Sequence, residues 1–196
     1  IMKLNEFKYP QDDINIPSFH KEIWYDNEYN RFDICIEKDD LVVDCGANIG
    51  LFTQYAISKG AKQVYSFECD DNYFNYLKQN TSSNSNITIY KGVVSDRDKD
   101  WNIPKIIDSV TMGERINYLK VDIEGWEYPT LINCPNEYLN MVDKIAIEVH
   151  FNIDRNRLQT LNLLDKLSLC GFRVSYEHIH KNTLLGMIYG VKQINK

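Results

Sequence analysis

A glycine-containing turn between a hydrophobic segment and a helical segment carries the clearest chemical signal in this sequence. Asp44 stands two residues before Gly46, and Gly50 follows Gly46 by four residues. Glycines let backbone N–H groups come close to a ligand at a helix N-terminus, where the helix dipole favours a carboxylate or a phosphate. We therefore expect a ligand site here, rather than the alternative of a tight strand-to-helix corner that binds nothing.

The spacing of this turn favours one cofactor over another. The dinucleotide pattern GxGxxG would require glycine at positions that hold Asn48 and Leu51, and the P-loop pattern is absent as well. The spacing fits the turn that binds S-adenosylmethionine (SAM). Asp44 would hold the cationic amino group of the methionine end, and the N–H groups near Gly46 and Asn48 would face its carboxylate. We predict that the turn residues Asp44, Gly46, Ala47, Asn48 and Gly50 bind the cofactor.

A second acid follows at the end of the next predicted strand. Glu68 lies 24 residues after Asp44. A carboxylate at this distance past a glycine turn accepts two hydrogen bonds from a ribose diol in nucleotide-binding folds. The alternative is a surface glutamate that merely ends a strand. We also predict cofactor contacts for Cys69 and Val94.

Further segments complete a recognisable pattern. They are Glu22-Ile23, Tyr29, residues 39–50 (DDLVVDCGANIG), Phe52-Thr53, residues 65–68, Asn72 and residues 119–127 (LKVDIEGWE). Together these segments resemble the FkbM-like family of class I SAM-dependent methyltransferases. Two features depart from the family: Cys69-Asp70 replaces a step that usually contains proline, and residues 95–118 form a short segment.

The resemblance implies an α/β fold: a Rossmann-like, doubly wound, seven-stranded sheet of order 3-2-1-4-5-7-6, with an antiparallel last hairpin and helices on both faces. It implies methyl transfer from SAM, with S-adenosylhomocysteine (SAH) as product, to a hydroxyl of a sugar, glycan or polyketide-like metabolite.

The segment Lys120-Val121-Asp122-Ile123-Glu124-Gly125-Trp126-Glu127 is the third motif. If the strand order follows the class I pattern, Asp122 and Asp44 project from neighbouring strand ends, where open α/β sheets bind ligands. The alternative is that Glu124 and Glu127 only charge the first turn of the following helix. Lys120 alternates onto the same face as Asp122 and needs an acidic partner if it is buried.

The fifth predicted strand ends in Glu148 and His150, which share one face by strand alternation. A neutral histidine near the sulfonium could accept the proton of an attacking hydroxyl. The alternative is that His150 only caps the end of the strand and has no catalytic role. Asp122, Glu148 and His150 could also form a Mg²⁺ site, but their spacing alone does not require a metal. We predict Asp122, Glu124 and His150 as catalytic residues and assign no metal ligands.

Alternating strands and helices must position these residues. From residue 39 the chain shows short apolar runs separated by helical segments, which is typical of a parallel sheet covered on both faces. We expect strands at 41–44, 63–67, 87–90, 118–122 and 142–149, helices at 51–58, 70–79, 125–133 and 155–169, and an antiparallel hairpin at 172–178 and 184–191.

Two helices of this series carry more specific predictions. Helix 155–169 should place Leu158, Leu161, Leu164 and Leu167 or Leu169 on one apolar face. Asp154 should cap its N-terminus, and Gly171 should follow its end. Helix 125–133 contains Pro129, which a helix tolerates only in its first turn.

Residues 1–38 mix polar and aromatic side chains without a clear period, and we interpret them as an N-terminal cap on a methyltransferase domain at 39–196. A short helix is expected near residues 18–25. The aromatic residues Trp24, Tyr25, Tyr29 and Phe32 favour a packed cap over a substrate platform.

Composition excludes several other classes. The chain has 22 basic and 28 acidic residues, a net charge of −6, and no basic run, so we expect no nucleic-acid partner. No apolar stretch approaches the roughly 18 residues that span a bilayer, and residues 1–13 are too polar for a signal peptide, so we predict a cytoplasmic protein without a membrane partner. The five cysteines show no zinc-ligand spacing. The sequence does not determine the oligomeric state.

Two other functions are alternatives to methyl transfer. One is a NAD-dependent oxidoreductase, which Asn48 and Leu51 disfavour. The other is a domain that binds SAM or a nucleotide without catalysing a reaction.

Overall fold

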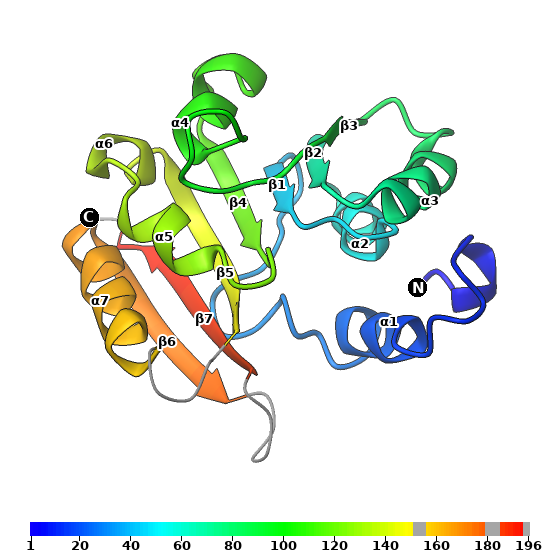
Figure 1. The fold of residues 1–196 in the computed structure, drawn as a ribbon, viewed down its shortest axis with the longest axis horizontal. Helices are drawn as coiled ribbons and strands as arrows, with labels where there is room; N and C mark the ends of the chain where they lie inside the picture. The colour runs from blue at the N-terminus through cyan, green and yellow to red at the C-terminus, as the bar shows by residue number, and fades with distance from the viewer. Residues whose placement is uncertain (151–155, 179–184, 194–196) are drawn as a thin grey trace.

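A seven-stranded sheet forms the centre of the computed structural model, which describes residues 1–150, 156–178 and 185–193. Its strand order is β3-β2-β1-β4-β5-β7-β6 (Figure 1). Strands β1 to β5 run parallel, and β7 is antiparallel to both β5 and β6. This confirms the predicted fold class and strand order. The strands are β1 (Leu41–Cys45), β2 (Gln63–Glu68), β3 (Ile87–Lys91), β4 (Ile116–Val121), β5 (Val142–His150), β6 (Phe172–His178) and β7 (Leu185–Lys192).

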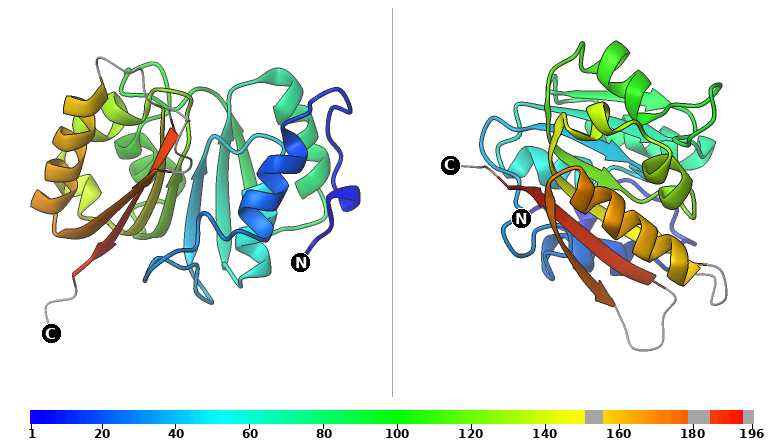
Figure 2. Two further views of the ribbon diagram at one scale, coloured as in Figure 1. Left: turned by 90° about the horizontal axis from the view of Figure 1, so that it is seen from below. Right: turned by 90° about the vertical axis from the view of Figure 1, so that its left-hand side faces the viewer.

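Helices cover both faces of the sheet, as predicted (Figure 2). Side chains alternate between the faces, so Val43 joins one buried cluster and Val42 the other. The first cluster lies under α4 (Ile103–Lys105), the π-helical turn η2 (Ile106–Val110), α5 (Glu127–Ile132), α6 (Asn136–Leu139) and α7 (Asn156–Leu169). The second lies under η1 (Leu4–Glu6), α1 (Ile16–Trp24), α2 (Leu51–Ser58) and α3 (Asp71–Thr81).

The segment between β3 and β4 contains helical structure that the sequence reading left unassigned. The side chain of Asn102 caps α4 by accepting the N–H of Lys105 at 3.0 Å, and Pro104 sits in the first turn, where a missing N–H costs nothing. Ile103, Ile106, Ile107 and Val110 are all buried, at a spacing typical of one helix face. That spacing was a usable signal, which the proline obscured.

The predicted apolar face of α7 is only partly confirmed. Leu167 is buried and Leu164 packs against the first buried cluster, as predicted. Leu158, Leu161 and Leu169 are instead 66%, 59% and 82% exposed, and the buried Leu163 was not predicted. The helix has leucines on two faces, so periodicity could not select between them. Thr160 decides the orientation, because its buried hydroxyl bonds to the Tyr128 hydroxyl at 2.8 Å. The predicted cap Asp154 lies outside the described residues.

Helix α5 begins at Glu127, so Pro129 falls in its first turn as predicted. Helix α1 spans Ile16–Trp24, close to the expected 18–25, and starts with Pro17 in its first turn. Within the described residues, no helix has both the length and the apolar character that crossing a membrane requires.

The N-terminal segment packs onto the sheet face that carries α2. Trp24 and Tyr55 meet edge to face with ring centroids 5.4 Å apart. Further along, the hydroxyl of Tyr189 on β7 donates to the carbonyl of Glu28 at 2.7 Å, and the hydroxyl of Tyr118 on β4 donates to the carbonyl of Tyr29. These two bonds fix residues 28 and 29 beside the carboxyl ends of β4 and β5.

Candidate active site

The turn after β1 is tightly fitted to the neighbouring strands. Gly46 has φ +83°, and a Cβ at this position would lie 1.7 Å from the carbonyl oxygen of Asp122. Both Gly46 and Ala47 donate their N–H groups to the carbonyl of Phe67, at 3.0 and 2.9 Å. Only glycine fits at position 46, because any side chain would displace the β4 end that carries Asp122.

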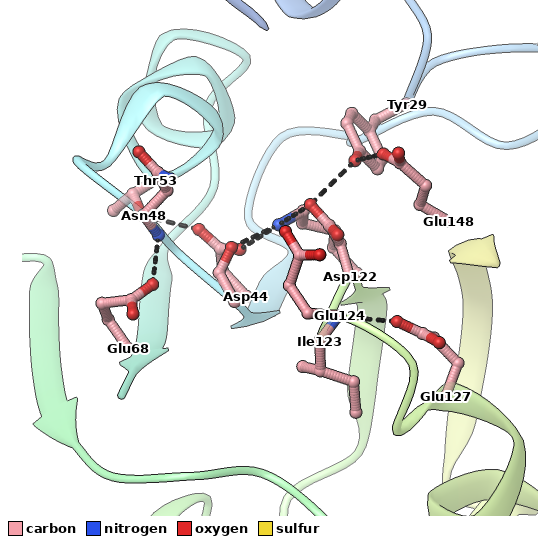
Figure 3. A network of polar contacts seen from close by, with 12 residues as sticks. Tyr29, Asp44, Asn48, Thr53, Glu68, Asp122, Ile123, Glu124, Glu127 and Glu148 are labelled. Carbon is pink, nitrogen blue, oxygen red and sulfur yellow. Dashed lines mark hydrogen bonds and ion pairs between the residues drawn. The ribbon is translucent and has the colours of Figure 1, made fainter. Parts of the chain in front are cut away.

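Glu68 closes this turn from the side of β2. One carboxylate oxygen accepts the N–H of Asn48 at 2.7 Å (Figure 3). The other accepts the N–H of Asp70 at 2.7 Å. The structure differs here from the prediction that the Gly46 and Asn48 amides face a ligand carboxylate. Phe67 and Glu68 on the adjacent strand already accept these N–H groups, a pairing that follows from the register of β1 and β2.

Asp44 is fully buried at the end of β1. Its Oδ2 accepts the hydroxyl of Thr53 at 2.7 Å, and its Oδ1 lies 3.2 Å from Nζ of Lys120. A buried carboxylate requires such partners, because removing an unpaired charge from water is very costly. The contact of Asp44 with the cofactor amino group stays a prediction. The Asp44 carboxylate already interacts with Thr53 and Lys120.

Lys120 lies between Asp44 and Asp122, the two acids that were expected at neighbouring strand ends. Its ammonium donates to the carbonyl of Gly46 at 2.6 Å and lies 3.4 Å from Oδ2 of Asp122. Burial lowers the pKa of Lys120, but Asp44 and Asp122 outweigh that effect and keep the ammonium charged. The expectation that a buried Lys120 would have an acidic partner is confirmed.

The loop after β4 is organised around Glu127, whose side chain is completely buried. Oε1 accepts the N–H groups of Ile123 and Gly125, both at 3.0 Å, and Oε2 lies 3.1 Å from the same Gly125 nitrogen. Oε1 also lies 3.1 Å from Nδ1 of His150. Glu127 therefore does more than charge the first helical turn, because it fixes the loop and the histidine together.

His150 is held in its cationic form. Burial lowers its pKa, but the hydrogen bond and charge of Glu127, with Asp122 and Glu124, raise it overall to about 9. Its Nε2 lies 3.5 Å from the carboxylate of Glu124, which is 88% exposed. A neutral histidine base near pH 7 was predicted, and the surrounding carboxylates work against that protonation state.

Tyr29 reaches this region from the N-terminal segment. Its hydroxyl lies 3.0 Å from Oε2 of Glu148 and 3.4 Å from Oδ2 of Asp122 (Figure 3). Burial raises the pKa of Glu148, and Asp122 and Glu28 raise it further, to about 8. Burial and the nearby Glu22 and Asp122 likewise raise the pKa of Glu28, to about 7. The aromatic pattern around Tyr29 predicts only a packed cap, and nothing in the sequence assigns a role to Glu28.

A metal could in principle use a different trio from the one considered in the sequence. Ligand atoms of Asp122, Glu127 and His150 all lie within 4.8 Å of one another. However, Glu127 is already engaged by two backbone N–H groups, and a metal would have to displace a proton from His150. This donor set fits a hydrogen-bonded cluster better than a cation site, and we assign no metal to it.

The remaining predicted residues are dispersed. Ala47 and Gly50 are buried in the turn, Val94 is buried with 4% exposure, and Cys69 is exposed beside Glu68. The structure thus brings together Asp44, Asp122 and Lys120 at one strand-end cluster and Asn48 with Glu68 at another. Glu28 was not singled out from the sequence, and Tyr29 and Thr53 were named only among the residues that carry the family resemblance, without a role in the site.

The strand order and this site define the chain as having the fold of class I methyltransferases. An rRNA methylase from Streptococcus thermophilus aligns with a TM-score of 0.58 at 14% identity, over 94% of this chain and 100% of that one. Aeropyrum pernix fibrillarin, solved with natively bound S-adenosyl-L-methionine, aligns with a TM-score of 0.60 at 14% identity, over 84% of this chain and 72% of that one.

Sequence comparison gives a narrower result. The model of the methyltransferase FkbM domain matches residues 100–174, which confirms the resemblance to that family. Protein arginine N-methyltransferase 8-B of Danio rerio is 34% identical over 85 residues, which make up 42% of this chain and 20% of that protein. The chain therefore spans about a fifth of the length of the curated relatives it matches.

Proposed function

We propose that this chain is a SAM-dependent methyltransferase that methylates a hydroxyl oxygen of a sugar, glycan or polyketide-like metabolite. The observation that carries the proposal is the pairing of Glu68 with the glycine turn, through the 2.7 Å bond from the N–H of Asn48. In this proposal residues 39–196 form the methyltransferase domain and residues 1–38 its cap. The match to the FkbM domain over residues 100–174 supports the same assignment.

Glu68 has the capacity to hold a ribose. A carboxylate offers about four acceptor positions, and two backbone N–H groups occupy two of them. The two that remain suit the two hydroxyls of a ribose diol. Since the backbone bonds also fix the carboxylate, little side-chain entropy is lost when a ligand binds.

The acidic groups at the ends of β4 and β5 suit the other end of the cofactor. SAM supplies an electrophilic methyl group on a positively charged sulfonium. Asp122 places negative charge where that cation would be favoured, and the cation would in turn favour the ionised form of Glu148. The cationic His150 can donate a hydrogen bond that orients an acceptor oxygen. Catalysis would depend mainly on holding the acceptor in line with the methyl group.

The charge of the chain favours a neutral acceptor. A net charge of −6 and the carboxylates Asp122 and Glu124 after β4 would repel a phosphate-rich ligand. Because similar proteins include an rRNA methylase and a protein arginine methyltransferase, RNA and protein acceptors are the comparison arms of the test.

Calorimetry with SAM, SAH and NAD tests the cofactor assignment. We expect SAM and SAH to bind and NAD not to bind, whereas the opposite preference would contradict the proposal. Glu68→Ala should weaken SAM and SAH binding by roughly 2–4 kcal/mol, or about thirtyfold or more, because charge-assisted hydrogen bonds to the ribose are lost. Glu137→Gln, an exposed carboxylate on α6, is the control and should leave the affinity unchanged.

A screen with methyl-labelled SAM tests the reaction. Label should enter a polyhydroxyl acceptor in preference to RNA or a protein. Binding of SAM without transfer to any acceptor class would favour the alternative of a domain that binds the cofactor without catalysis.

A further inference from the structure

Glu148 differs from every other carboxylate at the ends of the central strands. Asp44 is buried and paired with Lys120, Asp122 also lies beside Lys120, and Glu127 is occupied by backbone N–H groups. Among the described residues, Glu148 makes no ion pair within 4.0 Å, and its one hydrogen bond is the 3.0 Å contact from Tyr29 to Oε2. It is half-buried, so its carboxylate is within reach of a ligand.

We propose that Glu148 is the general base that accepts the proton of the acceptor hydroxyl, and that Tyr29 of the N-terminal segment positions its carboxylate. This inference rests on the proposed function and names a catalytic residue that the sequence reading did not select. In the reaction, the O–H bond of the acceptor breaks and its proton passes to Glu148. The oxygen electron pair forms the new bond to the methyl carbon, and the electrons of the broken carbon–sulfur bond stay on sulfur to give neutral SAH.

The surroundings of Glu148 match the requirements of a base. A general base works best when its pKa lies near the working pH, and burial with nearby negative charge brings Glu148 into that range. His150 is less suited, because its pKa is higher and the adjacent Glu127 holds its proton, whereas Glu148 has no ion-pair partner among the described residues and the sulfonium of SAM would favour its ionised form. The titratable groups that face Glu148 are Glu28 and Tyr29 from the N-terminal segment, Lys120 and Asp122 from the β4 end, His150 from β5 and Tyr189 from β7.

Tyr29 is suited to a positioning role. Its hydroxyl lies between Glu148 and Asp122, and its backbone is fixed through the Tyr118 hydroxyl. A hydrogen bond from Tyr29 favours the ionised form of Glu148, whose pKa it lowers against the effect of burial. The phenol thus offsets part of the effect of burial and of the two nearby acids, which favour the protonated form of Glu148.

Proton release on cofactor binding tests this inference without an identified acceptor. A sulfonium cation near Glu148 would lower its pKa from about 8 to between about 7 and about 5, so SAM binding at pH 7 should release about 0.4–0.9 of a proton per site. SAH carries no charge on sulfur and should release much less. The measurement is isothermal titration calorimetry with SAM and with SAH, each in phosphate and in Tris buffer, which differ in ionisation enthalpy.

Three variants assign the proton. Glu148→Gln should abolish most of the release while SAH affinity changes less than about twofold, and a melting curve verifies that it is folded. Tyr29→Phe should move the pH of half-maximal release upward, since the ionised carboxylate loses its donor. His150→Gln should retain the release.

The outcomes separate this inference from the proposed function. If SAM and SAH bind with equal proton release, or if the release persists in Glu148→Gln and disappears in His150→Gln, the assignment of Glu148 is wrong and SAM binding still stands. If neither SAM nor SAH binds, the proposed function fails, and the inference fails with it.

Discussion

Removing the Glu127 carboxylate is expected to destabilise the loop after β4. In Glu127→Ala, the N–H groups of Ile123 and Gly125 lose their acceptor, and the cationic His150 loses its nearest counter-charge. Leaving a buried hydrogen-bond donor unsatisfied costs about 1–3 kcal/mol, and breaking a buried ion pair costs about 3–5 kcal/mol. These costs overlap, so we expect a loss of roughly 3–5 kcal/mol of unfolding free energy.

The assay is thermal unfolding of the cofactor-free protein. For a chain of this size, 1 kcal/mol corresponds to about 2–4 °C, so the melting temperature of Glu127→Ala should fall by roughly 6–20 °C. Glu127→Gln keeps an acceptor oxygen for the backbone and should lose clearly less. Glu124→Gln is the matched control from the same loop, because that side chain is 88% exposed and should shift the melting temperature by at most about 2 °C. If Glu127→Ala melts within about 2 °C of the wild type, Glu127 is not the organising residue of the loop.

Three further perturbations follow from the same geometry. Gly46→Ala should lower the melting temperature by more than about 10 °C and abolish SAM binding, because the new Cβ would lie 1.7 Å from the Asp122 carbonyl oxygen. The control Gly113→Ala also has a positive φ, +79°, but has open space around the new Cβ, so it should cost only about 1–2 kcal/mol. Equal effects of the two substitutions would refute the steric explanation. Lys120→Met should destabilise by about 3–5 kcal/mol by leaving Asp44 unpaired, and Asp44→Asn in the same chain should recover part of this loss; strictly additive effects would show that the pair is not coupled. Folding raises the pKa of His150 from 6.5 to about 9, so the stability that His150 contributes is complete below about pH 6.5 and is lost as the pH rises through 9. Urea unfolding from pH 6 to 9.5 should therefore show that the unfolding free energy declines less with pH in His150→Gln than in the wild type. Parallel plots of unfolding free energy against pH would contradict the assigned ion pair.

The sheet was largely predictable from the sequence because its strands are short, apolar and bounded by clear turn or strand-end signals. Val42 and Val43 face opposite covered sides, so the continuous apolar run indicated a parallel strand buried on both faces. The failures came where local pattern was ambiguous. Pro104 concealed a helical turn, and the leucines of α7 satisfied two faces equally well, so that only the contact of Thr160 with Tyr128 selected one.

The site was predictable only as far as strand ends define it. Asp122 could be placed beside Asp44 because the strand order implied by the family resemblance makes their strands neighbours, and β1 and β4 are paired in the structure. The approach of Tyr29 could not be foreseen, since it lies 119 residues from Glu148 in the sequence and is fixed by tertiary bonds from two other tyrosines. The partners of the turn amides were equally hidden, because they depend on the exact register of β1 and β2.

The two tyrosine hydroxyls that fix residues 28 and 29 make docking of the N-terminal segment part of the chemistry of the sheet. Tyr118 and Tyr189 belong to strands far along the chain, so the segment is anchored only when β4, β5 and β7 are assembled. Binding at the strand ends and docking of the segment are then thermodynamically linked, and each stabilises the other by the same free energy. Because Tyr29 of this segment contacts Glu148 and Asp122, a change that undocks the segment would remove that contact, and the apparent affinity for a ligand at the strand ends would fall to the fraction of molecules that stay docked. The stability of docking of the segment before β1 therefore sets an upper limit on the affinity of the candidate site.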